Sequence, residues 1–345
     1  MNDDRARLAF VATAFAALAL YPLIAGPYGL DLVTKIMVFA IFALSLELLV
    51  GGTGLVCFGH AAFFGIGAYA TVLLTGERDA PSLLWLMPAC VLVAAAYALV
   101  VGALSLRTRG VYFIMVTLAF AQMAYYVVHD TPLGGGTDGI YLMSRPALGG
   151  LDLGKALPMY GLTLGCLAGV FALLAVVLRS RFGRALAGIR SNEQRMRATG
   201  FSTYPYKLGA FTLSGGLAGL AGVLFAIKDG YVNPEMLSWH QSGAVLIMVI
   251  LGGIGHLRGA LVGAFAFALL QELFKSEAVF GPFAKHWHLG LGLTIIVSVA
   301  LLPRGLVGLP QAWRERLVGR AARPAEADAT PGPRAAPAVA GGRDE

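Results

Sequence analysis

The chain has 345 residues, of which 57% are hydrophobic and 13% are charged. Soluble domains carry roughly 25% charged residues, so this composition excludes an ordinary soluble protein and predicts an all-α integral membrane protein. The formal net charge of +7 comes mainly from arginines between the apolar segments, which indicates membrane topology and contact with membrane lipid rather than with nucleic acid.

The apolar segments predict about ten transmembrane helices. The first segment is longer than the core of a signal peptide, which is roughly 7–15 residues, so we interpret it as a span. The eighth and ninth segments are short, so some broken or re-entrant segments are expected, and eight spans with two re-entrant segments are the alternative. The predicted spans cover residues 8–25, 32–50, 55–74, 83–105, 111–128, 157–178, 208–227, 241–251, 260–274 and 289–302.

The lysines and arginines predict the topology. Ten spans assign 19 of these residues to segments on one side of the membrane and six to segments on the other side. Basic residues near the ends of spans are retained in the cytoplasm, so both termini are predicted to be cytoplasmic.

The central polar stretch, residues 179–207, carries seven basic residues and one acid, Glu193. Ser191 followed by Gln194 fits a capping box, and Gly200 fits the glycine that follows a helix, so a short helix over about 192–199 is predicted. We interpret the stretch as a structured cytoplasmic loop that a soluble partner binds. A positively charged anchor without a partner is the alternative.

The domain prediction is a transmembrane domain over 1–310, which contains the 179–207 loop, and a cytoplasmic tail over 311–345. A short surface helix is predicted over 311–320. The remainder of the tail is rich in Ala, Pro and Gly without periodicity, so it is expected to be mostly disordered.

The string GGTGLVCFGHAAFFGIGAYA, residues 51–70, is the first candidate site. Its glycines favour close helix packing, and a histidine inside a membrane segment is costly unless it faces protein or water. Packing with a hydrogen-bonded histidine and lining or gating of a translocation pathway are both open. The candidate pathway residues are Gly51, Gly52, Gly54, His60, Gly65, Gly67 and Tyr69.

Two further features lie near this string. Residues 251–255 repeat the glycine spacing of residues 50–54, which suggests an internal repeat. Glu47 lies about one turn from the inner end of the second span, where it either extends to the interface or holds a structural hydrogen bond. The absence of a carboxylate near the middle of a span argues against an ion-driven carrier.

A second glycine-rich string, residues 134–139, follows the fifth span. The sequence GxxxxGK[ST] occurs nowhere in the chain, so the chain has no P-loop ATPase motif of its own. The string is interpreted as a structural turn or as an outer-face docking surface that includes Gly135, Gly136 and Asp138. The sequence shows no Ser/His/Asp, Cys/His or HExxH constellation, so no enzyme activity, catalytic residue or metal site is predicted.

Five strings together resemble the LivM type of permease in ABC importers of branched-chain amino acids. They are GGTGLVCFGHAAFFGIGAYA (51–70), LRTRGVYFIMVTLAF (106–120), GGTDGI (135–140), FGRALAGIRSNEQRMRATGFSTYPYKLGAFTLSGGLAGLAGVLFA (182–226) and SGAVLIMVILGGIGHLRGALVGA (242–264).

The resemblance implies a translocation subunit for amino acids, branched-chain ones foremost, in the bacterial inner membrane. A urea or short-chain amide ABC permease is the alternative within the class, and a stand-alone channel or secondary carrier lies outside it. The implied partners are a LivH-type sister permease, two cytoplasmic ABC ATPases and a periplasmic solute-binding protein. The chain itself is expected to bind no cofactor, with ATP and Mg on the ATPases.

The resemblance also implies that the central loop is the coupling region. The residues carried over for ATPase coupling are Gly183, Arg184, Arg190, Asn192, Glu193 and Gly200. The chain departs from the family at Cys57, where the family often has serine, and in the string EQRMRATG, which is more basic than usual. The second departure is expected to keep the fold and to suit a matched ATPase.

Overall fold

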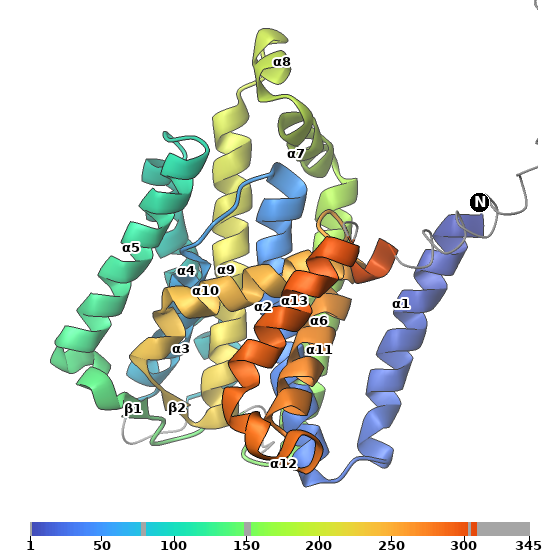
Figure 1. Ribbon diagram of the computed structural model, residues 1–345. Coiled ribbons are helices and arrows are strands. Elements are labelled where there is room, and N and C mark those ends of the chain that lie inside the picture. The colour runs from blue at the N-terminus through green and yellow to red at the C-terminus, as the bar shows by residue number, and fades with distance from the viewer. Residues whose placement is uncertain (1, 77–80, 148–152, 303–304, 309–345) are drawn as a thin grey trace, which may run out of the picture. The chain divides into compact units, whose positions relative to one another are not determined.

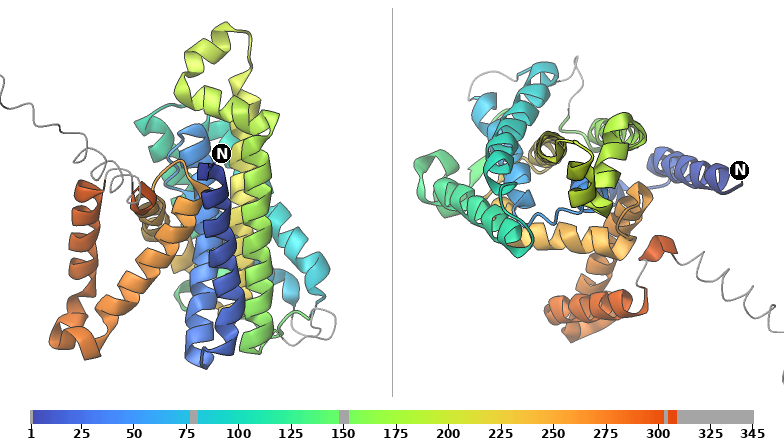
Figure 2. Two further views of the ribbon diagram at one scale, coloured as in Figure 1. Left: turned by 90° about the vertical axis from the view of Figure 1, so that its right-hand side faces the viewer. Right: turned by 90° about the horizontal axis from the view of Figure 1, so that it is seen from above.

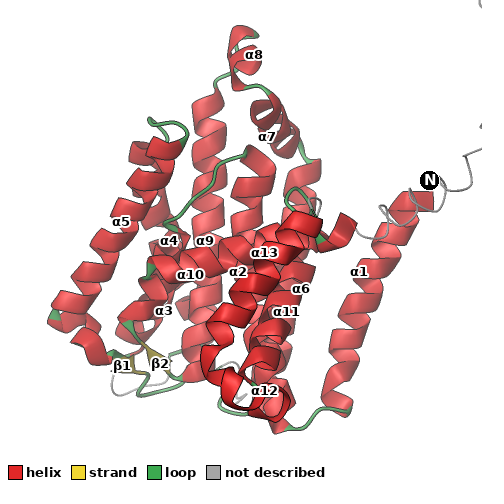
Figure 3. Cartoon of the chain, in the orientation of Figure 1, coloured by secondary structure: helices red, strands yellow, loops and turns green. Residues whose placement is uncertain are grey.

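The structure is a computed structural model that describes residues 2–76, 81–147, 153–302 and 305–308. Residues Met1–Val307 form one compact unit. Helices dominate the described chain, with two short strands at one end (Figure 3). The surface helix predicted over 311–320 and the tail from 321 lie outside the described residues.

Two long helices form the centre of this unit. Most of α2 (Pro27–Thr53) and α9 (Thr203–Asp229) is buried, and the two helices pack against each other. In addition, α9 packs against α3 (His60–Thr75), and α2 packs against α6 (Ala156–Arg179). Lipid tails are as apolar as the side chains, so the hydrophobic effect does not drive the helices together in a membrane. The centre therefore depends on close packing through small residues such as the glycines of α9.

The surrounding helices are more exposed. The end-on view in Figure 2 places α1 and α13 at the periphery, and α5 lies at one edge in Figure 1. An aromatic contact between Phe15 and Phe171 and a 2.6 Å hydrogen bond from the Tyr160 hydroxyl to the Leu18 carbonyl join α1 to α6. The remaining long helices are α1 (Asn2–Leu20), α4 (Leu83–Ser105), α5 (Val111–Asp130), α10 (Trp239–Gly252), α11 (Leu257–Lys275) and α13 (Trp287–Leu301).

Each of the ten predicted apolar segments is helical, but the helices differ in length. Seven segments of the described chain are long and apolar enough to cross a membrane, namely α2, α4, α5, α6, α9, α11 and Ala284–Gly308 around α13. Three are shorter: Ala9–Leu23, α3 and α10. The all-α membrane class is therefore confirmed, whereas the number of crossings and the side of each terminus remain predictions.

The third predicted span began too early. The prediction placed it at residue 55, whereas α3 begins at His60. Gly54, with a φ of +76°, ends α2, and a non-helical segment over 54–59 connects the two helices. The conformation at Gly54 is one that side chains larger than hydrogen disfavour, so the glycine itself stops the helix.

The unit has two distinct ends. One end, here called the α8 end, carries α7 (Arg181–Ser191) and α8 (Glu193–Ala198), and α1 begins at the same end (Figure 1). The opposite end, called the β end, carries β1 (Ile140–Tyr141), which pairs in antiparallel register with β2 (Tyr231–Val232). The short helices are η1 (Tyr21–Leu23), η2 (Pro132–Gly134), η3 (Gly136–Asp138), η4 (Pro234–Leu237), α12 (Glu277–Phe280), η5 (Gly281–His286) and η6 (Leu306–Gly308).

Candidate functional site

The central polar stretch is almost entirely helical. The Ser180 hydroxyl caps α7 by accepting a 3.3 Å hydrogen bond from the Gly183 N–H, and the Asn192 side chain caps α8 by accepting a 2.9 Å bond from the Arg195 N–H. The predicted helix over 192–199 is present as α8, but its capping residue was wrong. Ser191 is the last residue of α7, and its hydroxyl donates to the Gly188 carbonyl instead.

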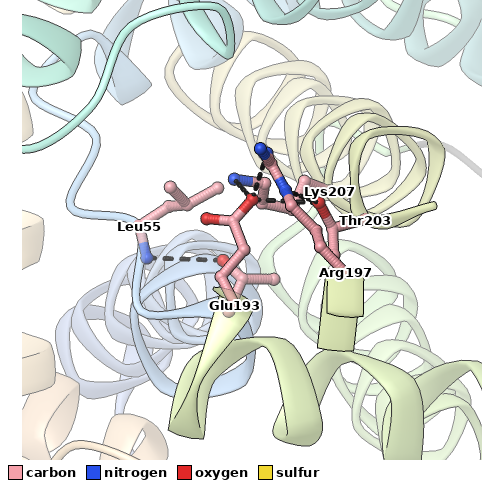
Figure 4. A network of polar contacts seen from close by, with 6 residues as sticks. Leu55, Glu193, Arg197, Thr203 and Lys207 are labelled. Carbon is pink, nitrogen blue, oxygen red and sulfur yellow. Dashed lines mark hydrogen bonds and ion pairs between the residues drawn. The ribbon is translucent and has the colours of Figure 1, made fainter. Parts of the chain in front are cut away.

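Glu193 lies at the centre of a polar network between α8 and the first turns of α9 (Figure 4). One of its carboxylate oxygens, Oε1, is 2.7 Å from the Arg197 guanidinium, 2.9 Å from the Lys207 ammonium and 2.9 Å from the Thr203 hydroxyl. Lys207 is buried inside α9, although the sequence placed it in the loop. Glu193 therefore holds α8 on α9 from within the protein.

The charges of this network set the pKa of Glu193. Burial of the carboxyl group alone would raise its pKa. Hydrogen bonds from Lys207 and Thr203, with the positive charges of Lys207 and Arg197, outweigh burial and lower the pKa of Glu193 to about 2.

The other predicted coupling residues have separate roles. A side chain at Gly183 would overlap the Leu178 carbonyl, so the turn from α6 to α7 requires a residue without a Cβ atom. Gly200 follows α8 with a φ of +82°. Arg184 is exposed, and its guanidinium donates to the Arg179 carbonyl at 3.3 Å.

Arg190 is exposed, but its side chain extends to the bundle. Its guanidinium donates to the Gly51 carbonyl near the end of α2. The sequence analysis did not single out the exposed residues that form the surface of α7 and α8, although these residues alternate with apolar ones in the sequence. These exposed side chains are Arg181, Gln194 and Arg195.

The glycine-rich string divides between two helices. Gly51 and Gly52 belong to the last turns of α2, whereas Gly65, Gly67 and Tyr69 belong to α3. A Cβ atom at Gly67 would overlap the backbone of Gly219 on α9, and one at Gly65 would overlap the Leu237 side chain. These two glycines therefore permit close packing of α3, as the packing interpretation expected.

His60 is fully buried at the start of α3, where four helices meet. The Ser45 hydroxyl donates to the Phe42 carbonyl at 2.7 Å and lies 2.8 Å from the His60 Nε2 atom, which assigns the ring proton to Nε2. The Ser214 hydroxyl donates to the Ser45 carbonyl, and the Ser242 hydroxyl accepts from the Ala61 N–H at 2.9 Å. The sequence analysis missed these three serines.

The string over 134–139 forms the turn that leads into β1. Gly135, Gly136 and Gly139 all have positive φ angles. The Asp138 carbonyl accepts a 2.7 Å hydrogen bond from the Tyr231 hydroxyl, and the Tyr69 hydroxyl lies 3.5 Å from the Gly134 carbonyl. The side chain of Asp138 is exposed, as a docking surface would require.

A cavity of about 200 Å³ also lies at this end, beside the first turns of α2 and α6. Its charged lining residues are Asp31, Arg145, Lys155 and Lys228. The Lys228 ammonium is paired with Asp31 at 2.9 Å and with Asp229 at 2.8 Å, so the charges of α9 at the β end are largely satisfied within the protein.

A bundle of apolar helices with glycine-packed centre and a folded, cationic segment at one end defines a polytopic membrane permease. Residues 28–300 match the family model described as the permease component of the branched-chain amino acid transport system, and the chain belongs to this family. Members are translocation components and are not themselves enzymes.

Three relatives illustrate the similarity. The chain is 31% identical to the high-affinity branched-chain amino acid transport system permease protein LivM of Salmonella typhimurium over 83% of this chain and 72% of the relative. It is 30% identical to LivM of Escherichia coli K12 over 87% of this chain and 75% of the relative. The xylose transport system permease protein XylH of Escherichia coli K12 is 30% identical over only 34% of this chain and 30% of the relative.

Proposed function

We propose that this chain is the membrane-spanning subunit of an ABC importer that carries branched-chain amino acids across the bacterial inner membrane. The family and the two LivM relatives support the class and the solute. The observation that carries the coupling role is the folded α7–α8 segment at the α8 end, which exposes Arg184 and Arg195 and is joined internally to α9. A positively charged anchor without a partner would need the basic residues, but it would not need the contacts that join α8 to α9.

The proposed assembly has three kinds of protein partner. Two cytoplasmic ATPases, which bind ATP and Mg, dock on the segment over 179–207, and a LivH-type sister permease completes the membrane part. A periplasmic solute-binding protein docks at the β end, where Gly135, Gly136 and Asp138 form the exposed turn before β1. In this proposal residues 1–310 are the permease domain, and 311–345 are a cytoplasmic tail.

The mechanism follows from the connections of the α7–α8 segment. Glu193 joins α8 to α9, so movement of α8 by an ATPase reaches one of the two buried central helices. The proposed pathway residues, from Gly51 to Tyr69, lie on α2 and α3, which pack against the same helix. We infer that a shift of α9 against α3, at the contact between Gly219 and Gly67, changes access to the solute.

Affinity purification of the tagged chain in mild detergent, followed by mass spectrometry, tests the assembly. We expect a second permease and P-loop ATPases to copurify. Proteoliposomes of that complex with its binding protein should take up leucine, isoleucine and valine only with ATP, and urea, an amide and xylose should not compete. Uptake by the isolated chain without ATP would overturn the proposal in favour of a channel or carrier.

Two arginines of α8 test the docking surface. The Arg195 side chain is exposed and makes no ion pair with a described residue, whereas Arg197 is paired with Glu193. Arg195→Glu should therefore reduce ATPase recovery about tenfold and leave the thermal stability of the purified chain unchanged, because only an external contact is reversed. Arg197→Gln, the matched variant, should instead loosen α8. Full recovery of ATPase with Arg195→Glu would exclude this surface as the docking site.

A further inference from the structure

Two glycine-rich strings that lie far apart in the sequence meet at the α8 end. The first, residues 51–54, ends α2, and the second, residues 252–255, connects α10 to α11. A Cβ atom at Gly51 would lie 3.0 Å from the backbone nitrogen of Gly255. The end of α2 thus contacts the turn between α10 and α11 backbone against backbone.

Glu47 joins the two strings from inside the bundle. Its side chain is buried on α2, and its Oε1 atom accepts a 2.6 Å hydrogen bond from the Gly255 N–H. The second oxygen, Oε2, is also buried and has no hydrogen-bond partner among the described residues. A buried carboxylate with one oxygen unpaired is costly, so a neutral acceptor would hold this turn better than a glutamate does.

Arg190 reaches the same two strings from outside, on α7. Its guanidinium donates to the Gly51 carbonyl, and its Nη1 atom would lie 3.2 Å from a Cβ atom placed on Gly255. Glu47 and Arg190 contact the same two glycines and yet are not ion-paired in this structure. Residues 47 and 51 lie four apart on α2, and therefore on one helix face, and the Glu47 carboxylate lies where a Cβ atom on Gly51 would be.

We propose that Glu47 is a positioning residue of the transport cycle, and that the Arg190 guanidinium exchanges the Gly51 carbonyl for the free carboxylate oxygen of Glu47 when α7 moves. This inference rests on the proposed function, because an ATPase partner is what moves α7. The exchange gives α7 two alternative contacts near the end of α2, the Gly51 carbonyl and the Glu47 carboxylate beside it. Because Glu47 also holds Gly255, each exchange pulls on the turn between α10 and α11.

The test measures solute uptake and ATP hydrolysis separately in proteoliposomes that hold the complete complex and its binding protein. Glu47→Gln keeps an oxygen that accepts from the Gly255 N–H but removes the charge that attracts Arg190. We expect assembly and ATP hydrolysis to persist and the number of solute molecules taken up per ATP to fall about tenfold. Glu272→Gln, which alters a carboxylate on α11 that contacts Tyr28 at the β end, is the matched control and should leave this ratio unchanged.

The double variant tests whether the two residues act on each other. If they form one switch, Glu47→Gln combined with Arg190→Gln should lower the ratio about tenfold, as each single variant does, rather than about a hundredfold. A normal ratio with Glu47→Gln, or independent losses in the double variant, would overturn the inference. Absent uptake by the wild-type complex would instead overturn the proposed function itself.

If the Glu47→Gln variant does not assemble into the complex, variants of Arg190 provide a second test of the proposed exchange. A glutamine at position 190 can still donate to the Gly51 carbonyl, whereas a lysine keeps the positive charge that a carboxylate attracts. The proposed exchange therefore requires Arg190→Lys to retain more uptake per ATP than Arg190→Gln. The opposite order would show that the contact with the Gly51 carbonyl alone matters, and would overturn the exchange.

Discussion

Glu193 shows how one side chain can serve coupling without touching the partner. The resemblance to the family singles it out for ATPase coupling, yet its carboxylate is occupied by Lys207, Thr203 and Arg197. It is therefore suited to transmit a force between α8 and α9 rather than to receive an external ligand. The exposed Arg195, two positions along the same short helix, is the better candidate for an external contact.

The lowered pKa of Glu193 predicts how this junction responds to acid. Because the pKa is lower in the folded protein than the ordinary value of 4.5, the stabilisation is present above about 4.5 and is lost as the pH falls toward about 2. Glu193→Gln should speed hydrogen exchange of the 193–203 backbone several-fold at pH 6. The difference from wild type, measured at equal pH by mass spectrometry, should vanish near pH 2. Equal exchange rates of the wild type and Glu193→Gln at pH 6 would show that Glu193 does not hold α8 on α9.

At the scale of single elements, the contact between α3 and α9 depends on the absence of side-chain atoms. Gly67→Ala would push a methyl group into the backbone of Gly219 and should destabilise the protein by about 1–3 kcal/mol, the usual cost of overpacking. Gly161→Ala on the exposed face of α6 meets no atom within 4 Å and should be neutral or slightly stabilising. Thermal unfolding in detergent measures both, and equal midpoints would show that α3 can shift without cost.

The helices could be predicted from the sequence because long apolar runs are local signals. The amphipathic α7 was missed because its arginines suggested a loop, although its buried residues Ala185, Leu186 and Ile189 recur at helical spacing. The contact between Glu47 and Gly255 joins residues 208 positions apart, and no pattern in a single sequence encodes such a pairing. The repeat of the glycine strings was visible, but their direct contact was not.

For the whole molecule, the number of membrane crossings depends on short apolar helices such as α3 and α10. The 14 residues of α10 span about 21 Å, less than the roughly 30 Å of the hydrocarbon core. Its first turn nevertheless follows β2 and η4 at the β end, and its last turn leads to Gly255 at the α8 end. We therefore expect the segment to cross together with its flanking turns.

Cysteine labelling tests this topology. Trp239→Cys and Ile254→Cys replace exposed residues at the two ends of α10, and we expect a membrane-impermeant maleimide to reach them from opposite sides. Thr137→Cys and Thr199→Cys, at the β end and in the α7–α8 segment, mark the outer and inner sides in the proposed orientation. Labelling of positions 239 and 254 from the same side would favour the arrangement of eight spans with two re-entrant segments.

The contact between the two glycine strings also limits how this protein can be recombined with its relatives. A chimera that joins the first half of this chain to the second half of another permease would unite α2 from one parent with the α10–α11 turn from the other. A Cβ atom at position 51 would overlap the Glu47 carboxylate and lie only 3.0 Å from the Gly255 nitrogen, and Glu47 needs that backbone N–H at the same place. Residues 47–54 and 252–255 should therefore be exchanged together, as a single inherited unit.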